Sequence, residues 1–192
     1  MKKIILLQSI GHIDPVILLK LRKDLERWFK VYDIRIKILS DEIPLSDLEY
    51  NSNRRQYNAS LIKDNLRNYV RNKKYFRTLG IIDEDIFAKD FNFVFGIAEM
   101  PKMQFHEFSG TALISLIRLS EKFYERAENF DLFELRTLKE AIHELGHTFG
   151  LEHCENFCIM QFSNCLADTD EKPPNLCESC SIKMKHFFST LI

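Results

Sequence analysis

Apolar residues at the start of the chain predict a strand, a helix and a second strand in turn. Residues 2–10 (KKIILLQSI) form a nearly continuous apolar run of strand length. Residues 14–30 follow with helical spacing, and Asp14 and Pro15 stand where the cap and the first turn of a helix are expected. Residues 32–39 then alternate between apolar and polar positions. This order is typical of a sheet whose faces are covered by helices.

The next part of the chain predicts one more helix and one more strand. In residues 53–74, apolar side chains recur near helical spacing among many charged ones, at Tyr57, Leu61, Leu66 and Val70. The segment TLGIID, residues 78–83, is typical of a buried strand. We therefore expect the helix to cover one face of the sheet.

Two further strands and a long helix are predicted after them. Residues 91–100 (FNFVFGIAEM) and 110–119 (GTALISLIRL) have strand patterns, and Pro101 and Gly110 mark a loop between them. The amphipathic segment 130–149 predicts a helix that carries histidines. The rest of the chain is expected to be mostly irregular, so it needs a source of order other than packed helices and strands.

The size and composition of the chain indicate one globular domain. Its 192 residues are 45% apolar and 29% charged. With a net charge of -1, no nucleic-acid partner is expected. No apolar run is long enough to span a membrane, and the first one ends at Gln8 without a signal-peptide cleavage site. We expect a cytoplasmic protein and a monomer.

The segment HELGHTFGLEHCENFCIM, which begins at His143, carries the candidate chemistry. His143 and His147 are four residues apart on the predicted helix, so their imidazoles share one face and can hold a single ion. Glu144 lies beside that ion, where a carboxylate can take a proton from water. Gly150 can end the helix in a sharp turn that brings His153 to the same metal. The spacing therefore predicts a catalytic zinc site.

Cysteines in the same part of the chain suggest a second metal site. All five fall between residues 154 and 180, so they cannot cross-link the body of the fold as a secreted disulfide framework would. Cys165 could serve as a ligand, but we favour a small buried hydrophobic role for it. His186 could also replace a thiolate, but a surface or packed histidine is favoured. The other four form two pairs that suit a four-thiolate structural zinc site: Cys154, Cys158, Cys177 and Cys180.

The motif HExxHxxGxxH followed by a methionine, here Met160, is the metzincin signature. With the adjoining Cys154, the Cys-x-Met of Cys158 and Met160 and the downstream CxxC, the chain resembles the archaemetzincin family. Two spacings are one residue shorter than the family pattern: three residues separate Cys154 from Cys158, and 16 separate Met160 from Cys177. Phe162 occupies the position at which some metzincins have a tyrosine.

The resemblance implies a fold, substrates and two zinc ions per chain, one catalytic and one structural. The implied fold is α/β (α+β) and metzincin-like: a mixed, twisted sheet of about five strands, an active-site helix and a small zinc-stabilised C-terminal subdomain. We assign residues 1–192 to one catalytic domain, with 1–150 as its upper part and 151–192 as the subdomain. Peptide or protein substrates would pair with the edge strand Phe93–Met100.

The favoured function is hydrolysis of peptide bonds by a zinc-activated water, with Glu144 as the general base and zinc on the three histidines. One alternative is a zinc-stabilised peptide-binding module whose catalytic-looking site is occluded or inactive. Glu144 argues against it, because a purely structural metal needs a fourth ligand and no base. Hydrolysis of a non-peptide amide is a third possibility.

Overall fold

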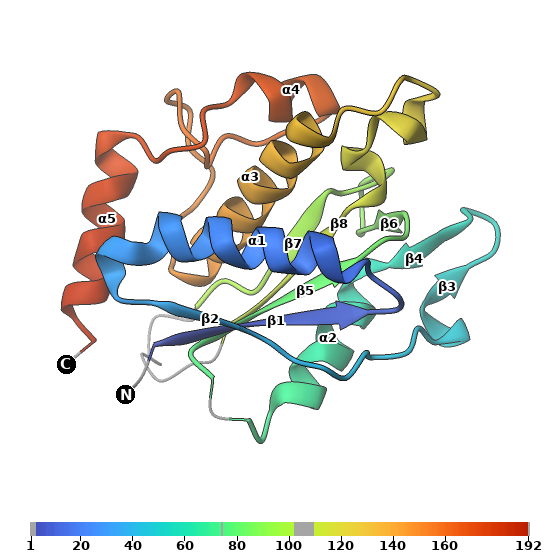
Figure 1. The fold of residues 1–192 in the computed structure, drawn as a ribbon, viewed down its shortest axis with the longest axis horizontal. Coiled ribbons are helices and arrows are strands. Elements are labelled where there is room, and N and C mark those ends of the chain that lie inside the picture. The colour runs from blue at the N-terminus through green and yellow to red at the C-terminus, as the bar shows by residue number, and fades with distance from the viewer. Residues whose placement is uncertain (1–2, 74, 102–109, 192) are drawn as a thin grey trace.

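A computed structural model of the chain describes residues 3–73, 75–101 and 110–191. A mixed five-stranded sheet lies at its centre in the order β2-β1-β5-β8-β7 (Figure 1). Four strands are parallel, and β7 pairs antiparallel with β8 at one edge. The strands are β1 (Ile4–Ile10), β2 (Arg35–Ile38), β5 (Arg77–Ile82), β7 (Gly96–Ala98) and β8 (Gly110–Ser115). The mixed sheet implied by the resemblance is confirmed.

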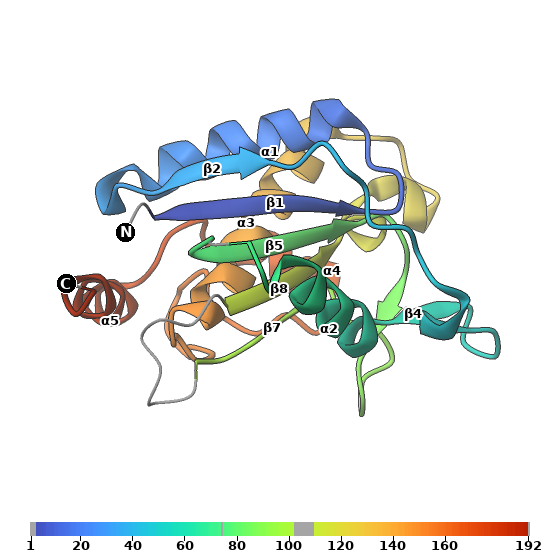
Figure 2. The ribbon, with the colours of Figure 1, turned by 90° about the horizontal axis from the view of Figure 1, so that it is seen from below.

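Helices cover both faces of the sheet. The first and third helices pack with the core on one face, and the second packs on the other (Figure 2). None of the helices in the described ranges is long and apolar enough to cross a membrane. The α-helices are α1 (Pro15–Trp28), α2 (Ala59–Val70), α3 (Phe130–Thr148), α4 (Leu166–Glu171) and α5 (Glu178–Ser189). Short 3-10 turns are η1 (Phe29–Tyr32), η2 (Asp47–Glu49), η3 (Ile117–Leu119) and η4 (Glu121–Tyr124).

The central strands are buried on both faces, which explains their continuous apolar runs. In β1, Ile5 and Leu7 join the core under α1 and α3, whereas Leu6 joins the core under α2. All residues of β5 and β8 are buried as well. The predicted opening of strand, helix and strand is confirmed, with Asp14 as the cap of α1.

The helix expected in residues 53–74 is shorter than predicted, and it buries a different set of side chains. Asn58 caps α2, and the residues before it form β4 (Gln56–Asn58) in a small second sheet with β3 (Tyr50–Asn51) and β6 (Ile86–Phe87). Leu61 is 45% exposed, and the buried face of α2 consists of Ala59, Ile62, Leu66 and Val70. Leu61 therefore lies outside the buried face of α2, and Tyr57 lies before the helix although it packs against the same core. The sequence pattern misled because Tyr57 precedes the helix.

Two expected strands are shorter than the sequence pattern suggested. Only three residues of 91–100 form β7, and β8 ends at Ser115, after which the chain turns into η3. Most of the predicted loop, residues 102–109, lies outside the described residues. The stretch before β7 leaves the sheet and lines a groove described below.

The C-terminal segment is irregular over residues 151–165 and 172–177, as expected, but the sequence did not predict its two helices. It contains α4 and α5, of six and 12 residues. Helix α5 packs into the main core through Met184, Phe187 and Phe188, and the Phe188 ring stacks on Tyr32 with centroids 4.5 Å apart. Packing against distant rings stabilises this helix, so its own sequence gives a weak signal.

Candidate metal centres

Helix α3 carries two of the three candidate histidines. Asn129 caps its first turn, where the side-chain oxygen accepts a hydrogen bond from the Leu132 N–H at 3.1 Å. Residues one turn apart on a helix share a face, and the Nε2 atoms of His143 and His147 lie 3.0 Å apart. The helix predicted over 130–149 is confirmed and ends one residue earlier, at Thr148.

A tight turn after α3 brings the third histidine back to the other two. Gly150 has φ +85°, a conformation that side chains disfavour. Its N–H donates to His147 O at 2.9 Å and the next N–H donates to Gly146 O at 3.1 Å, which is the Schellman pattern of a helix end. The ring of His153 therefore lies 5.3 Å from that of His143 and 4.8 Å from that of His147.

Backbone carbonyls fix the tautomer of the two helical histidines. His143 Nδ1 donates to Ile159 O at 2.9 Å, and His147 Nδ1 donates to Leu151 O at 2.7 Å. Because a carbonyl only accepts, Nδ1 must carry the proton and Nε2 keeps its lone pair. Burial also lowers the pKa of His143 well below its usual range and that of His147 to about 4. Both rings are therefore neutral at pH 7, as metal binding requires.

The geometry of the three nitrogens fits a zinc ion. The candidate ligand atoms lie within 4.8 Å of one another. Ligands about 2.0–2.1 Å from a tetrahedral Zn²⁺ stand roughly 3.3 Å apart, close to the 3.0 Å between the two helical Nε2 atoms. Three imidazoles also leave one position of a tetrahedron open, as catalytic sites require. His143, His147 and His153 could therefore hold a catalytic zinc.

Glu144 is enclosed between the helix and the edge strand. It is 5% exposed, and a Cβ atom on Gly96 of β7 would lie only 2.6 Å from Glu144 Cγ. Burial raises the pKa of Glu144 well above its usual range, the charge of Glu140 raises it further, and the charge of Lys172 opposes the shift. Glycine at position 96 therefore makes the room that the Glu144 side chain occupies.

Met160 lies in a turn beneath α3. It is fully buried, and a Cβ atom on Gly146 would lie 2.6 Å from its Sδ. The turn is closed by Gln161 N–H donating to Cys158 O at 3.0 Å, and Met160 O accepts from Cys154 N–H at 3.0 Å. The segment after the third histidine is thus tied directly to the floor of the site.

Four cysteines form a second cluster beside this turn. The Sγ atoms of Cys154 and Cys177 are 3.7 Å apart, and thiolates about 2.3 Å from one Zn²⁺ stand roughly 3.8 Å apart. Backbone N–H groups point at Cys158 Sγ, from Cys177 at 3.3 Å and from Met160 at 3.5 Å. The two spacings that are one residue short still bring all four sulfurs together: Cys154, Cys158, Cys177 and Cys180.

The pKa shifts of these thiols indicate that a bound cation would be needed to ionise all four of them. The Cys180 N–H donates a hydrogen bond that lowers the pKa of Cys177 to about 6, whereas burial raises the pKa of Cys158 and of Cys180. On their own, the four sulfurs cannot all be thiolates at pH 7. A Zn²⁺ would supply the positive charge that four buried thiolates need.

Two other candidate ligands stand apart from this cluster. Cys165 is exposed and precedes α4, so the expectation that it is a buried hydrophobe was wrong. Cys165 stands at the N-cap of α4, and its backbone N–H donates to Asp168 Oδ2 at 3.1 Å, so its position in this turn and not packing explains its place. His186 is an exposed residue of α5, as expected. Neither belongs to a metal-binding group among the described residues.

A groove of about 400 Å³ opens over the histidines. The edge strand β7 and the chain before it form one side, and α3 with residues 152–163 forms the other. Phe162 lines it, and its ring lies 4.9 Å from that of His153, so it packs on this histidine and offers no hydroxyl. All three histidines and Glu144 face the same open space.

Sequence reasoning missed a buried ion pair in the floor of the groove. Lys172 Nζ donates to Glu140 Oε1 at 2.7 Å, and both residues line the groove although they are 2% and 3% exposed. Glu140 stands one helical turn before Glu144, a spacing that could have drawn attention to it. Lys172 is 32 residues further along the chain, and no local signal marks it.

Zinc metallopeptidases of the metzincin class combine a helix ending in a glycine turn with histidine ligands on both sides of that turn, and this fold and donor set agree with them. Comparison with known proteins narrows the class to one family. The chain belongs to Peptidase family M54, whose model matches residues 1–186. It is a zinc metallopeptidase, and the resemblance to the archaemetzincins is confirmed.

Archaeal relatives match along nearly the whole chain. The archaemetzincin of Pyrococcus furiosus is 37% identical over 188 residues, which are 96% of this chain and 94% of that protein. The archaemetzincin of Methanocaldococcus jannaschii is 40% identical over 182 residues, which are 94% of this chain and 92% of that protein. The crystal structure of the Methanopyrus kandleri archaemetzincin is 30% identical with a TM-score of 0.80, covering 97% of this chain and 96% of that one.

Proposed function

We propose that the chain hydrolyses peptide bonds in the groove, with the catalytic zinc on His143, His147 and His153 and with Glu144 as the general base. The observation that carries this proposal is the convergence of these four side chains on one open groove. A bound Zn²⁺ would polarise the scissile carbonyl and lower the pKa of a water molecule. The open groove also favours catalysis over an occluded binding module.

In this proposal Glu144 is the group that moves protons. It follows the ligand His143 directly, and burial raises the pKa of its carboxyl, whereas a Zn²⁺ on the neighbouring histidines would lower it. It would take a proton from the attacking water and later deliver it to the leaving amine. The neighbouring charge of Glu140 raises the pKa of this carboxyl further, and the charge of Lys172, which is paired with Glu140, opposes that shift.

The free edge of β7 is suited to binding an extended peptide. Phe95 O and Glu99 N–H bond to β8, at 2.8 Å and 2.9 Å. Because bonding alternates along a strand, the backbone groups of Gly96 and Ala98 face the open side. A substrate strand could pair with them and lie across the histidines. We therefore propose residues 96–98 as the strand that pairs with substrate, a shorter segment than the predicted Phe93–Met100.

We also propose a second, structural zinc on the four cysteines. Cys154 follows the ligand His153 directly, and Cys158 lies in the turn that carries Met160. A metal there would anchor the third histidine, this turn and the start of α5 to one another.

Metal content and cleavage together test this function. We expect two zinc ions per chain by elemental analysis, and one in His143→Ala purified without chelator. Cleavage of a peptide library should be abolished in that variant. One zinc that survives the His143 change in full, with no cleavage by the wild type, would favour the binding module instead. If the protein cleaves small non-peptide amides but does not cleave peptides, its function would be hydrolysis of non-peptide amides.

A further inference from the structure

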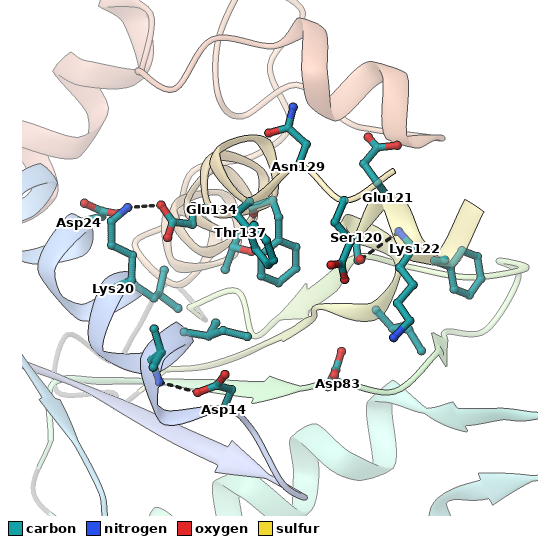
Figure 3. A pocket seen from close by; sticks show the side chains of 18 residues that line it. Asp14, Lys20, Asp24, Asp83, Ser120, Glu121, Lys122, Asn129, Glu134 and Thr137 are labelled. Atoms are coloured by element: carbon teal, nitrogen blue, oxygen red, sulfur yellow. Dashed lines mark hydrogen bonds and ion pairs between the residues drawn. The ribbon is translucent and has the colours of Figure 1, made fainter. Parts of the chain in front are cut away.

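A second cavity, of about 550 Å³, lies around the N-terminal end of α3 (Figure 3). His143 and His147 lie near the other end of this helix. The walls of the cavity are the first halves of α1 and α3 and the turns η3 and η4. Phe133, which lines the cavity, and His143 are ten residues apart on α3, so roughly 15 Å of helix separates the cavity from the histidines. The size is that of a pocket for a small organic ligand, which is typically about 300–1,000 Å³.

The cavity lies where open sheets of parallel strands commonly bind ligands. It stands at the carboxyl ends of β1 and β5, since Asp14 follows β1 and Asp83 directly follows β5. From β1 the chain continues through α1 to β2, whereas from β5 it continues toward β8 on the other side. Strand connections that diverge in this way open a crevice between neighbouring strand ends.

The walls combine an apolar lining with negative charge. Ile17, Leu21 and Phe133 contribute to the lining, and Val16 and Phe130 remain 68% and 70% exposed. Six carboxylates line the cavity against two lysines, and they belong to Asp14, Asp24, Asp83, Glu121, Glu128 and Glu134. An apolar body with a positive charge would match both features.

Part of this negative charge is already neutralised. Lys20 binds both Asp24 and Glu134, and Glu121 binds Arg136 at 2.6 Å. In the part of the chain that the structure describes, the remaining three carboxylates have no cation within 4.0 Å: Asp14, Asp83 and Glu128.

Asp83 has the best position among these three. Figure 3 shows its carboxylate rising from the floor toward the space between the walls, with Asp14 on one side and Lys122 on the other. Asp83 is exposed as a residue, yet the protein around its carboxylate desolvates it enough to raise its pKa, while the charge of Lys122 opposes that shift. Asp14 already accepts the Val16 N–H at 2.8 Å.

We propose that this cavity binds a small organic cation with an apolar body, whose ammonium group meets Asp83 and whose hydrocarbon part lies on the α1 and α3 walls. Such a site is separate from the metal centres. It does not depend on the reaction proposed above.

Three probes with one hydrocarbon body and different charges test the proposal. 4-Phenylbutylamine, 4-phenyl-1-butanol and 4-phenylbutyrate are titrated into the zinc-loaded, isotope-labelled full chain, and amide shifts are followed by NMR. We expect the amine to shift resonances of Asp83, Ser120 and Thr137, with a Kd about five-fold lower than that of the alcohol, because one partly exposed ion pair contributes up to about 1 kcal/mol. The carboxylate should bind most weakly.

Two variants locate the charge effect. Asp83→Asn should remove the advantage of the amine over the alcohol and leave the Kd of the alcohol unchanged. Glu26→Gln removes an equal charge from an exposed position of α1 outside the cavity, and should leave both Kd values unchanged. Equal Kd values for all three probes, no shifts around the cavity, or shifts confined to residues near the histidines would overturn the proposal.

Discussion

Glu144 combines deep burial with a position next to the proposed metal ligand His143, so its side chain can be changed without changing the proposed ligands. We expect Glu144→Gln to lower kcat/KM by at least about 10²-fold, because an amide cannot accept the proton of the attacking water. Zinc content should stay at the wild-type value. Peptide cleavage and elemental analysis on the same preparation measure both quantities.

Glu152→Gln is a matched control, since Glu152 is an exposed carboxylate that lines the same groove. It should retain most of the activity. A Glu144→Gln variant that cleaves peptides within ten-fold of the wild-type rate would show that another group is the base.

The pair of Lys172 and Glu140 leads to a prediction about stability. Lys172→Met leaves the Glu140 carboxylate buried without its cation, so the free energy of unfolding should fall by about 3–5 kcal/mol. Adding Glu140→Gln should recover a large part of this loss, because the buried charge is then gone. Denaturant unfolding of the wild type, the single variant and the double variant measures the effect.

An exposed ion pair is the control for this series. Arg67 binds Glu99 at 3.0 Å on the surface, and Arg67→Ala should change the free energy of unfolding by no more than about 1 kcal/mol. If the double variant is as unstable as Lys172→Met alone, the loss comes from packing of the lysine chain and not from an unpaired charge.

How much of the site the sequence predicts depends on how local its geometry is. His143, His147 and His153 are brought together by helix spacing and one glycine turn, so a motif of 11 residues suffices. The salt bridge of Lys172 and the opening that Gly96 provides depend on contacts between distant segments, and no period or spacing records them. The prediction that Cys165 is buried was wrong, because a residue type gives only an average preference for burial.

At the scale of elements, β7 is held between its partner strand and the active-site helix. A Cβ atom on Gly96 would lie 2.7 Å from Leu113 O and 2.6 Å from Glu144 Cγ. We expect Gly96→Ala to lower the free energy of unfolding by about 1–3 kcal/mol and to lower kcat/KM as well, because the strand or the Glu144 side chain must move. Thermal unfolding and peptide cleavage measure the two effects.

Ala98→Gly is the comparison on the same strand. It removes a side chain on the same face, so it should cost about 0.5–1 kcal/mol and lower kcat/KM less than Gly96→Ala does, because it puts no atom against Glu144. If Gly96→Ala behaves like Ala98→Gly in both measurements, the edge strand is free to shift away from Glu144.

The elements that the sequence predicts well are those with a long, regular pattern. The buried strands β1, β5 and β8 and the helices α1 and α3 have such patterns, and each is present. The strands β3, β4 and β6 have only two or three residues, too few for any period to show. Helix α5 is stabilised by aromatic contacts with residues far away in the sequence, so its local pattern is weak.

At the scale of the whole molecule, the C-terminal segment shares one core with the rest of the chain. Leu151, Cys158, Met160 and Met184 belong to the same cluster as residues of α1 and α3. We infer that residues 1–150 and 151–192 form a single cooperative unit, as the sequence led us to expect. Thermal unfolding followed by calorimetry should then show one transition, and two separate transitions would contradict the inference.

Loss of the cysteine site should therefore affect the entire protein. In Cys177→Ser/Cys180→Ser the proposed structural zinc would lose two ligands. We expect Tm to fall by on the order of 10 °C and the catalytic zinc to be lost as well, since Cys154 and His153 are neighbours. His153→Ala is the matched control: it removes an exposed side chain that we propose as a ligand of the catalytic zinc, so it should cost one zinc and the activity but little stability. Calorimetry and elemental analysis decide between the two patterns. If the cysteine variant keeps its catalytic zinc and its Tm, the four thiols do not organise the active site.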